Sequence, residues 1–264
     1  MQLSQDEQFK KVMDFESRPL SFSSMKSFIT SPAKFWFYRL GLLKWGKHDD
    51  FSKHFHALLL EGVKPIIFDP SERPEQSKGM TSKLNKEWKL SLGDDLMSLE
   101  DFEEMQEIRT RMMSTGFKNW IEDDSILKEP TKFHDFDGYK TYIKPDMVKP
   151  NDFVLDVKHM GDDLSDGAIR RFIEKNKTYM QLAIYAKGYN CDSAYVLAYS
   201  KKPPYNFVLH QVDDYYLELG MIEFNHYIAK MKDTTKEQFL SSKLTGDIIY
   251  PSSYLVNRIE ELNN

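Results

Sequence analysis

The stretch that decides the fold reads YIKPDMVKPNDFVLDVK, from Tyr142 to Lys158. It holds runs of β-forming residues broken by Pro-Asn-Asp at 150–152, which predicts two antiparallel strands that fold back around a turn centred on Asn151. In that register Asp146 lies opposite Asp156. Directly opposed side chains on one face of a sheet have Cβ atoms about 5 Å apart, so the two carboxylates are expected side by side.

The two faces of this hairpin differ in chemistry because strand side chains alternate. Lys158 lies two residues after Asp156 and therefore points to the same side. This even-numbered face gathers two carboxylates and a lysine, which is unfavourable unless a cation binds there. The odd-numbered face is apolar and is expected to join the core, through Ile143, Pro145, Met147, Phe153, Leu155 and Val157.

This arrangement favours a metal-dependent hydrolase. Two carboxylate oxygens at that spacing suit Mg²⁺, which takes one or two protein carboxylates and leaves other positions to water and phosphate. A neighbouring ammonium at Lys158 can orient or deprotonate an attacking water, as metal-assisted phosphodiester hydrolysis requires. The alternative is a surface hairpin with an ordinary salt bridge between Asp156 and Lys158, and Asp-x-Lys alone does not decide between them.

Two further segments carry candidate site residues. Gln181 and Tyr185 are four residues apart, which places them on one face of a predicted helix, where they can bind a phosphate or hold the lysine. The alternative is a half-buried amphipathic helix with an isolated amide. His56 borders an apolar stripe in the segment 52–61, and a histidine in that position is either a core residue or a ligand.

The rest of the chain alternates between helical and strand-like patterns, which predicts an α/β fold with a central mixed β-sheet flanked by helices. We expect one domain over residues 1–264, with a helical N-terminal part of about 1–125, a catalytic sheet core of about 126–232 and a helical C-terminal tail of about 233–264. Predicted helices cover 33–40, 52–61, 98–112, 170–188 and 213–232, with two short ones after them, and predicted strands cover two or three segments within 132–158 together with 194–199 and 206–211.

Composition sets the broad class of protein. The chain has 264 residues, of which 41% are hydrophobic and 29% charged, as in an ordinary soluble globular protein. No apolar run approaches the roughly 20 residues of a membrane helix, and the polar start predicts no secretory signal, so we expect a cytoplasmic protein with no membrane partner. Cys191 is the only cysteine, which excludes an internal disulfide and a four-cysteine iron–sulfur cluster. No phosphate-binding loop for ATP is present.

The net charge of -5 leaves a nucleic-acid partner open, because carboxylates of a metal site count toward it. Basic residues gather in two stretches, one at 78–89 and one at 170–177. Either stretch is a DNA-binding surface or a solvated helix face. From them we predict four DNA contacts, at Arg170, Arg171, Lys175 and Lys86.

The order of these motifs resembles a known nuclease superfamily. The order His56-x-x-Leu-Leu-Glu61, Pro145-Asp146, Asp156-x-Lys158 and Gln181-x-x-x-Tyr185 is similar to the nuclease domains of the PD-(D/E)XK superfamily, and above all to exodeoxyribonuclease VIII, the phage-type recombination exonuclease. The similarity includes the opening segment LSFSSMKSFITSPAKF at 20–35, with its serine-x-serine-x-x-lysine pattern. It also includes Glu129, which lies where the family has a glutamate ahead of its first hairpin strand.

The resemblance implies a set of roles for the candidate residues. It implies Mg²⁺ or Mn²⁺ as the cofactor, a catalytic lysine at Lys158, and a phosphate-facing pair at Gln181 and Tyr185. The implied metal ligands and their neighbour are Asp146, Asp156 and His56, with Glu61 in support of His56.

The resemblance also implies an activity and partners. The expected function is digestion of linear double-stranded DNA from the 5′ end in phage-type homologous recombination, which leaves a 3′ single strand. The expected partners are duplex DNA ends, a single-strand annealing protein and further copies of this chain in a ring-like homo-oligomer, such as a tetramer.

Two other functions are compatible with the sequence. The first is another PD-(D/E)XK nuclease, either an endonuclease or a single-strand nuclease. The second is a nuclease-like protein that binds DNA or a protein partner without cutting. The complete set of Asp146, Asp156 and Lys158 favours a catalyst, because a binding role alone does not require these charges on one face.

Overall fold

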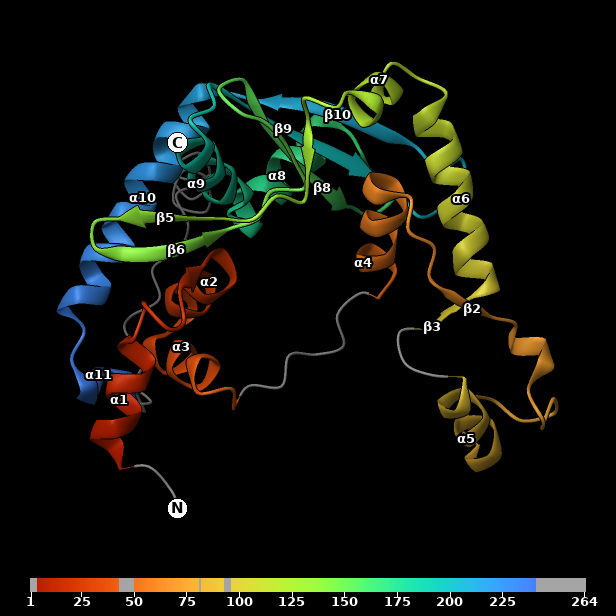
Figure 1. The fold of residues 1–264 in the computed structure, drawn as a ribbon, viewed down its shortest axis with the longest axis horizontal. Helices are drawn as coiled ribbons and strands as arrows, with labels where there is room; N and C mark the ends of the chain where they lie inside the picture. The colour runs from red at the N-terminus through yellow and green to blue at the C-terminus, as the bar shows by residue number, and fades with distance from the viewer. Residues whose placement is uncertain (1–3, 43–49, 81, 93–95, 241–264) are drawn as a thin grey trace, which may run out of the picture.

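The computed structural model describes residues 4–42, 50–80, 82–92 and 96–240 (Figure 1). Its centre is a five-stranded sheet in the order β10-β9-β8-β7-β4. β8 and β9 are parallel and the other pairs are antiparallel, so the predicted α/β fold with a mixed sheet is confirmed. The strands are β4 (Leu127–Lys128), β7 (Met147–Lys149), β8 (Phe153–His159), β9 (Ser193–Tyr199) and β10 (Phe207–Val212).

The hairpin at the centre of the sequence argument forms in the predicted register. β7 and β8 pair through Met147↔Leu155, Val148↔Val154 and Lys149↔Phe153, with Asn151 at the turn in the left-handed region (φ 62°). This register is the one that brings Asp146, just before β7, alongside Asp156 in β8.

The hairpin is shorter than the sequence indicated. β5 (Lys132–Phe136) and β6 (Tyr139–Ile143) form a hairpin of their own, which pairs with β1 (Leu20–Ser21) in a separate three-stranded sheet. The prediction that Ile143 and Pro145 share one apolar face with Met147 was therefore wrong. Proline has no amide hydrogen to donate to a ladder, and the strand ends two residues before Pro145.

The central sheet has a hydrophobic core on each face. The odd-numbered residues Phe153, Leu155 and Val157 of β8 pack into one core, as predicted. The even-numbered Val154 packs into the second core, so the even face is buried as well and is no solvent-facing surface. This follows from the place of β8 between two neighbouring strands, with helices over both faces of the sheet.

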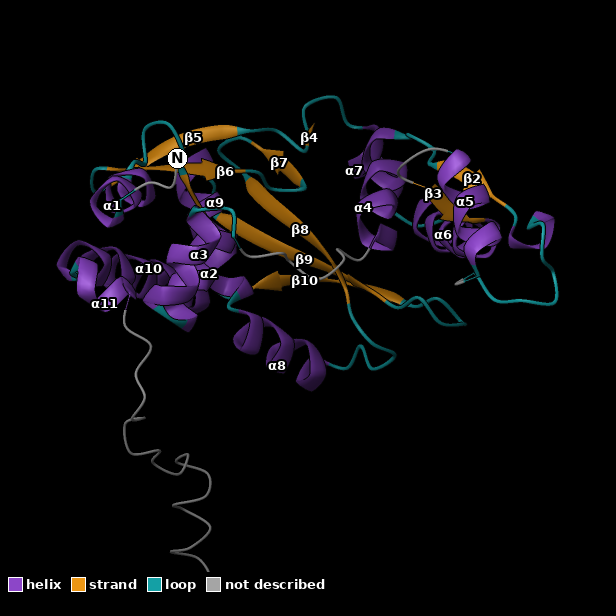
Figure 2. Cartoon of the chain, turned by 90° about the horizontal axis from the view of Figure 1, so that it is seen from below, coloured by secondary structure: helices purple, strands orange, loops and turns teal. Residues whose placement is uncertain are grey.

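The helices form two groups, one on either side of the sheet in Figure 2. The larger group packs around the core of Val154, and the smaller one packs around that of Leu155. The larger group contains α1 (Gln5–Met13), α2 (Phe22–Thr30), α3 (Pro32–Arg39), α8 (Asp166–Asn176), α9 (Thr178–Tyr189), α10 (Asp214–Asp233) and α11 (Lys236–Leu240). The smaller one contains α4 (Asp50–His56), α6 (Leu99–Met113) and α7 (Phe117–Glu122), beyond which α5 (Lys83–Ser91) lies beside the two-stranded sheet of β2 (Ile66–Phe68) and β3 (Leu96–Ser98).

The predicted helices at 33–40 and 98–112 are confirmed, and each begins after a serine cap. Ser31 caps α3, with Pro32 at its first position, and Ser98 caps α6. The apolar side of α6 is buried at Phe102, Met105, Ile108 and Met112.

The structure corrects three helical predictions. The helix expected at 170–188 is two helices, because Lys177 adopts a left-handed conformation (φ 53°) that ends α8 before α9 begins. The segment expected as one helix at 52–61 is α-helical to His56 and then forms a π-helix over Ala57–Glu61. The N-terminal part, expected to be helical, also contributes β1, β2 and β3.

The remaining predicted elements agree with the structure. The strands at 194–199 and 206–211 correspond to β9 and β10, and the helix at 213–232 corresponds to α10. One of the two short C-terminal helices is α11, whereas 241–264, and with it the rest of the predicted tail, lies outside the described residues. In the described part of the chain, no helix combines the length and the apolar character that a membrane span requires.

Candidate active site

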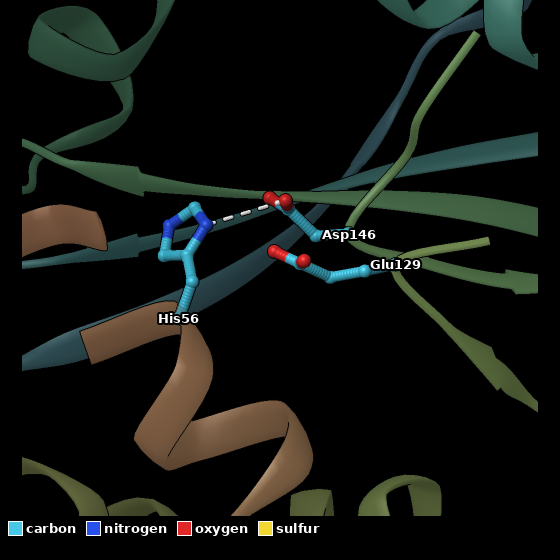
Figure 3. A group of neighbouring side chains, drawn as sticks. All are labelled: His56, Glu129 and Asp146. Carbon is cyan, nitrogen blue, oxygen red and sulfur yellow. Dashed lines mark ion pairs between the residues drawn. The ribbon is translucent and has the colours of Figure 1, made fainter. Parts of the chain in front are cut away.

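Three potential ligands converge beside the central sheet (Figure 3). His56 comes from the end of α4, Glu129 follows β4, and Asp146 precedes β7. One nitrogen or oxygen atom of each lies within 4.8 Å of the corresponding atom of the other two. One imidazole and two carboxylates around a common point are a donor set for a divalent cation.

Strand pairing explains how Glu129 reaches the site. β4 and β7 pair antiparallel through Leu127↔Val148 and Lys128↔Met147, and the ladder continues as the Glu129 amide donates to the Asp146 carbonyl at 2.8 Å. Glu129 itself has a left-handed backbone (φ 45°), which is unfavourable for a residue other than glycine. Such strained residues are frequent at functional sites, where the surrounding contacts hold them in place.

Asp146 is held from two sides. Its Oδ2 accepts a hydrogen bond from the Val157 amide at 2.5 Å, and its Oδ1 lies 3.3 Å from His56 Nδ1. Burial alone raises the pKa of Asp146, but the neighbouring His56 and Lys158 outweigh it and lower the pKa below its ordinary value. Burial likewise lowers the pKa of His56, but the Asp146 carboxylate raises it above its ordinary value. The pair is therefore stabilised in its charged form.

Asp156 and Lys158 form the second half of the site. Asp156 is 2% exposed, and its Oδ2 lies 2.5 Å from Lys158 Nζ. Burial raises the pKa of Asp156 to about 6, with the Asp146 carboxylate adding to the rise and the Lys158 ammonium opposing it. Burial also opposes the charge on Lys158, but the two carboxylates outweigh it, so the pKa of Lys158 is raised and the ammonium persists. The predicted juxtaposition of Asp146, Asp156 and Lys158 is present in the structure.

Gln181 and Tyr185 meet this cluster from α9. Gln181 Nε2 donates to the Tyr185 hydroxyl at 2.8 Å and lies 3.4 Å from Asp156 Oδ1. Burial raises the pKa of Tyr185, which keeps its hydroxyl protonated. The two side chains share one helical face, as predicted, and in this structure Gln181 contacts Asp156 while Tyr185 contacts Gln181.

A second lysine, Lys26 of α2, is influenced by the charge of the site. Burial lowers the pKa of Lys26, and the nearby positive charges of Lys158 and Lys34 lower it further. The sequence motif contains Lys26 but assigns it no role. Glu129 was matched to the family pattern without being counted among the ligands, and its one sequence signal is its place just before Pro130 and the strand that follows.

The other predicted residues lie apart from this cluster. Glu61 is exposed at the end of the π-helix, and in the described part of the chain it makes none of the hydrogen bonds or ion pairs that join the site residues. The predicted DNA contacts are exposed on other elements, and their role stays a prediction: Arg170, Arg171 and Lys175 lie on α8, and Lys86 lies on α5.

The donor chemistry fits Mg²⁺ or Mn²⁺. Carboxylate oxygens are the preferred ligands of Mg²⁺, and an imidazole nitrogen added to them is well suited to Mn²⁺. His56 Nε2 is buried and has no hydrogen-bond partner among the described residues. Since Nδ1 already faces Asp146, this second ring nitrogen beside the carboxylates is open to a ligand that the protein binds.

No family model matches this chain, and no curated protein matches it. Solved structures do match. The chain is similar to a protein from Eubacterium rectale that is described provisionally as an exonuclease, with 15% identity and a TM-score of 0.62 over 97% of this chain and 98% of the other. At that identity the match shows the fold, and it covers nearly all of both chains.

Two weaker matches also bear exonuclease descriptions. One is an alkaline exonuclease from Laribacter hongkongensis, at 11% identity and a TM-score of 0.30 over 80% of this chain and 99% of the other. The other is a phage-related exonuclease from Haemophilus somnus 129PT, at 13% identity and a TM-score of 0.32 over 81% and 96%. TM-scores this low do not support an argument about this chain.

Proposed function

We propose that this chain is a divalent-metal-dependent deoxyribonuclease of the PD-(D/E)XK type, which degrades linear double-stranded DNA from its ends. One observation carries the proposal: His56, Glu129 and Asp146 surround a common point next to the buried Asp156–Lys158 pair. The full-length likeness in fold to the Eubacterium rectale protein, with its provisional exonuclease description, supports it.

Three residues would hold the metal and two would serve the nucleophile. His56, Glu129 and Asp146 are the proposed ligands, with Asp156 beside them. A bound Mg²⁺ or Mn²⁺ supplies Lewis-acid polarisation of the scissile phosphate. Lys158 is placed by Asp156, and its ammonium orients the attacking water and offsets negative charge on the phosphate as that charge develops.

The reaction is a hydrolysis. The water oxygen forms a bond to phosphorus, one phosphorus–oxygen ester bond breaks, and the leaving oxygen takes up a proton. Gln181 fixes the Asp156 carboxylate, which in turn holds Lys158. The Lys26 ammonium adds positive charge on the α2 side of the site, where a phosphate of the substrate strand would bind.

Finer features of the proposal rest on the sequence resemblance. These are a 5′ to 3′ direction, a role in phage-type recombination, a single-strand annealing partner and a homo-oligomer, such as a tetramer. Sedimentation of the purified chain at micromolar concentration measures the last of these, and a 31.1 kDa monomer would argue against a ring.

The test compares linear duplex DNA with covalently closed circular DNA of the same sequence. We expect the linear form to be degraded to mononucleotides with Mg²⁺ or Mn²⁺, and to survive in EDTA, while the closed circle stays intact under all conditions. Labels at each end in turn report the direction.

The outcomes separate the levels of the proposal. Cleavage of circles as fast as of linear DNA removes the exonuclease and leaves an endonuclease of the same type. Cleavage restricted to single strands removes the duplex substrate. Binding of DNA with no cleavage under any metal removes the catalytic proposal altogether.

A further inference from the structure

A pocket of about 550 Å³ lies where α8, α9 and α10 meet. It is formed because α10 packs closely on α9 at Gly220, where an added Cβ would lie 2.9 Å from the Met180 Cα. This close crossing brings the first turns of α10 against the start of α9. The lining residues are Arg170, Glu174, Tyr179, Tyr215, Tyr216 and Leu219.

Two of the three tyrosines are fixed by their hydroxyl groups. Tyr216 donates to Glu174 Oε1 at 2.6 Å, and Tyr179 donates to Glu223 Oε2 at 2.7 Å. Lys177 pairs with the same Glu223 oxygen at 2.7 Å. Both carboxylates near the pocket are therefore engaged, and the two tyrosine rings, with centroids 5.8 Å apart, are held as rigid aromatic walls.

The third tyrosine and the arginine are exposed. Tyr215 has 70% of its surface exposed, although it lines the pocket. Arg170 is exposed, and its guanidinium takes part in none of the ion pairs among the described residues. The pocket thus combines fixed aromatic rings, one exposed ring and an available cation, which fits a ligand with a flat ring and a negative charge.

The pocket lies on the side of α9 opposite the candidate active site. Tyr179 lines the pocket, whereas Gln181 contacts Asp156. Residues two apart on a helix with 3.6 residues per turn lie about 200° apart around its axis. A ligand in this pocket is therefore separated from the metal site by the body of α9.

We propose that this pocket binds a nucleotide of single-stranded DNA, with the base against the tyrosine rings and the backbone phosphate on Arg170. Stacking on aromatic rings together with an arginine contact is how proteins bind single strands without sequence preference. The volume lies in the range of small-molecule sites. The inference rests on the proposed function, because degradation of one strand of a duplex leaves its complement single-stranded.

The test is a binding measurement that needs no cleavage. Fluorescence anisotropy of a labelled oligothymidylate is recorded with the full chain in EDTA. We expect Tyr215→Ala to weaken binding about tenfold, and Tyr215→Phe to bind as the wild type does, because the ring and not the hydroxyl stacks. Arg170→Ala is expected to weaken binding. It should also reduce the slope of log affinity against log salt concentration by about one, since one ion fewer is released on binding.

The control is Ile222→Ala, another exposed side chain on α10, which lies outside the pocket and is 59% exposed. Unchanged affinity in both Tyr215→Ala and Arg170→Ala overturns the inference, and so does an equal loss in the control. Preferential binding of an acidic peptide over the oligonucleotide would assign the pocket to a protein partner instead. The proposed nuclease is judged separately, by metal-dependent cleavage of duplex DNA by the wild type, so either idea can fail alone.

Discussion

Two groups of charged residues in the described part of the chain contrast with each other. Around Asp156 the charges are buried and coupled: Lys158 lies 2.5 Å from it, and the Asp146 carboxylate raises its pKa further. On α8 and α5, the cations Arg170 and Lys86 are exposed to solvent. A buried charge has lost its water and depends on its partners, whereas an exposed charge is screened and acts nearly alone.

This difference shows how strongly each group indicates function. A buried ion pair surrounded by further carboxylates contributes little to stability, so its presence calls for another explanation, which under the proposed function is a bound cation. Exposed lysines and arginines occur on most protein surfaces, and a role for them requires a second feature, such as the tyrosines beside Arg170. The effects of substitutions in the two groups should therefore differ both in magnitude and in the property that changes, either the cleavage rate or the DNA affinity.

The largest effect is expected from Asp146→Asn. The amide keeps an oxygen for the Val157 N–H group but removes the negative charge that the metal and His56 require. We expect the cleavage rate to fall about a thousandfold or more. The rise in melting temperature that Mn²⁺ gives the wild type should also disappear.

Asp152→Asn is the matched control, since Asp152 is an exposed carboxylate on the same hairpin, 3.6 Å from Lys149. It should cleave DNA and respond to Mn²⁺ as the wild type does. In EDTA, both variants should melt within about 5 °C of the wild type. Gross unfolding of Asp146→Asn in EDTA would instead indicate that the carboxylate serves the fold rather than a metal.

A smaller effect is expected from Lys158→Ala, which separates chemistry from binding. The ammonium acts mainly in the transition state, so turnover should fall about a hundredfold or more, while DNA affinity measured in Ca²⁺ changes little. Lys149→Ala, which removes a half-buried lysine paired with Asp152 on the same hairpin, serves as the control. Near-normal turnover in Lys158→Ala would remove this residue from the active site and leave the Asp156 pair as a structural salt bridge.

The sequence predicted the buried group well because short-range geometry determines it. Strand alternation and the turn at Asn151 place Asp146, Asp156 and Lys158 together, and helical spacing joins Gln181 to Tyr185. These relations join residues that are close in sequence. The repeat of side chains along a strand or a helix is fixed by its geometry, so it can be applied to the sequence alone.

Contacts between distant segments could not be derived in this way. Glu129 joins the candidate site because β4 pairs with β7 and because its own backbone is left-handed, and no residue pattern marks either feature. The break at Lys177 is equally hidden, since a lysine carries no signal for a left-handed conformation. The Lys158 charge acts on Lys26 only because the fold brings α2 near the site, which the local sequence does not describe.

The smallest effect is expected from Lys86→Ala, because Lys86 on α5 belongs to the exposed group of cations. If Lys86 contacts a DNA phosphate, its removal weakens duplex binding equally for all sequences, by a few-fold at moderate salt, and lowers the salt dependence by about one ion. Turnover at saturating DNA should not change, because Lys86 lies on α5, outside the catalytic cluster.

The control is Lys118→Ala, since Lys118 is a helix lysine paired with Glu122 at 3.5 Å on α7. The measurement is the DNA affinity of the Lys86→Ala and Lys118→Ala variants in Ca²⁺ over a range of salt concentrations. An unchanged salt dependence in Lys86→Ala would leave this lysine as part of a solvated helix face, whereas a loss of turnover at saturation would link α5 to the chemistry and contradict the division into two groups.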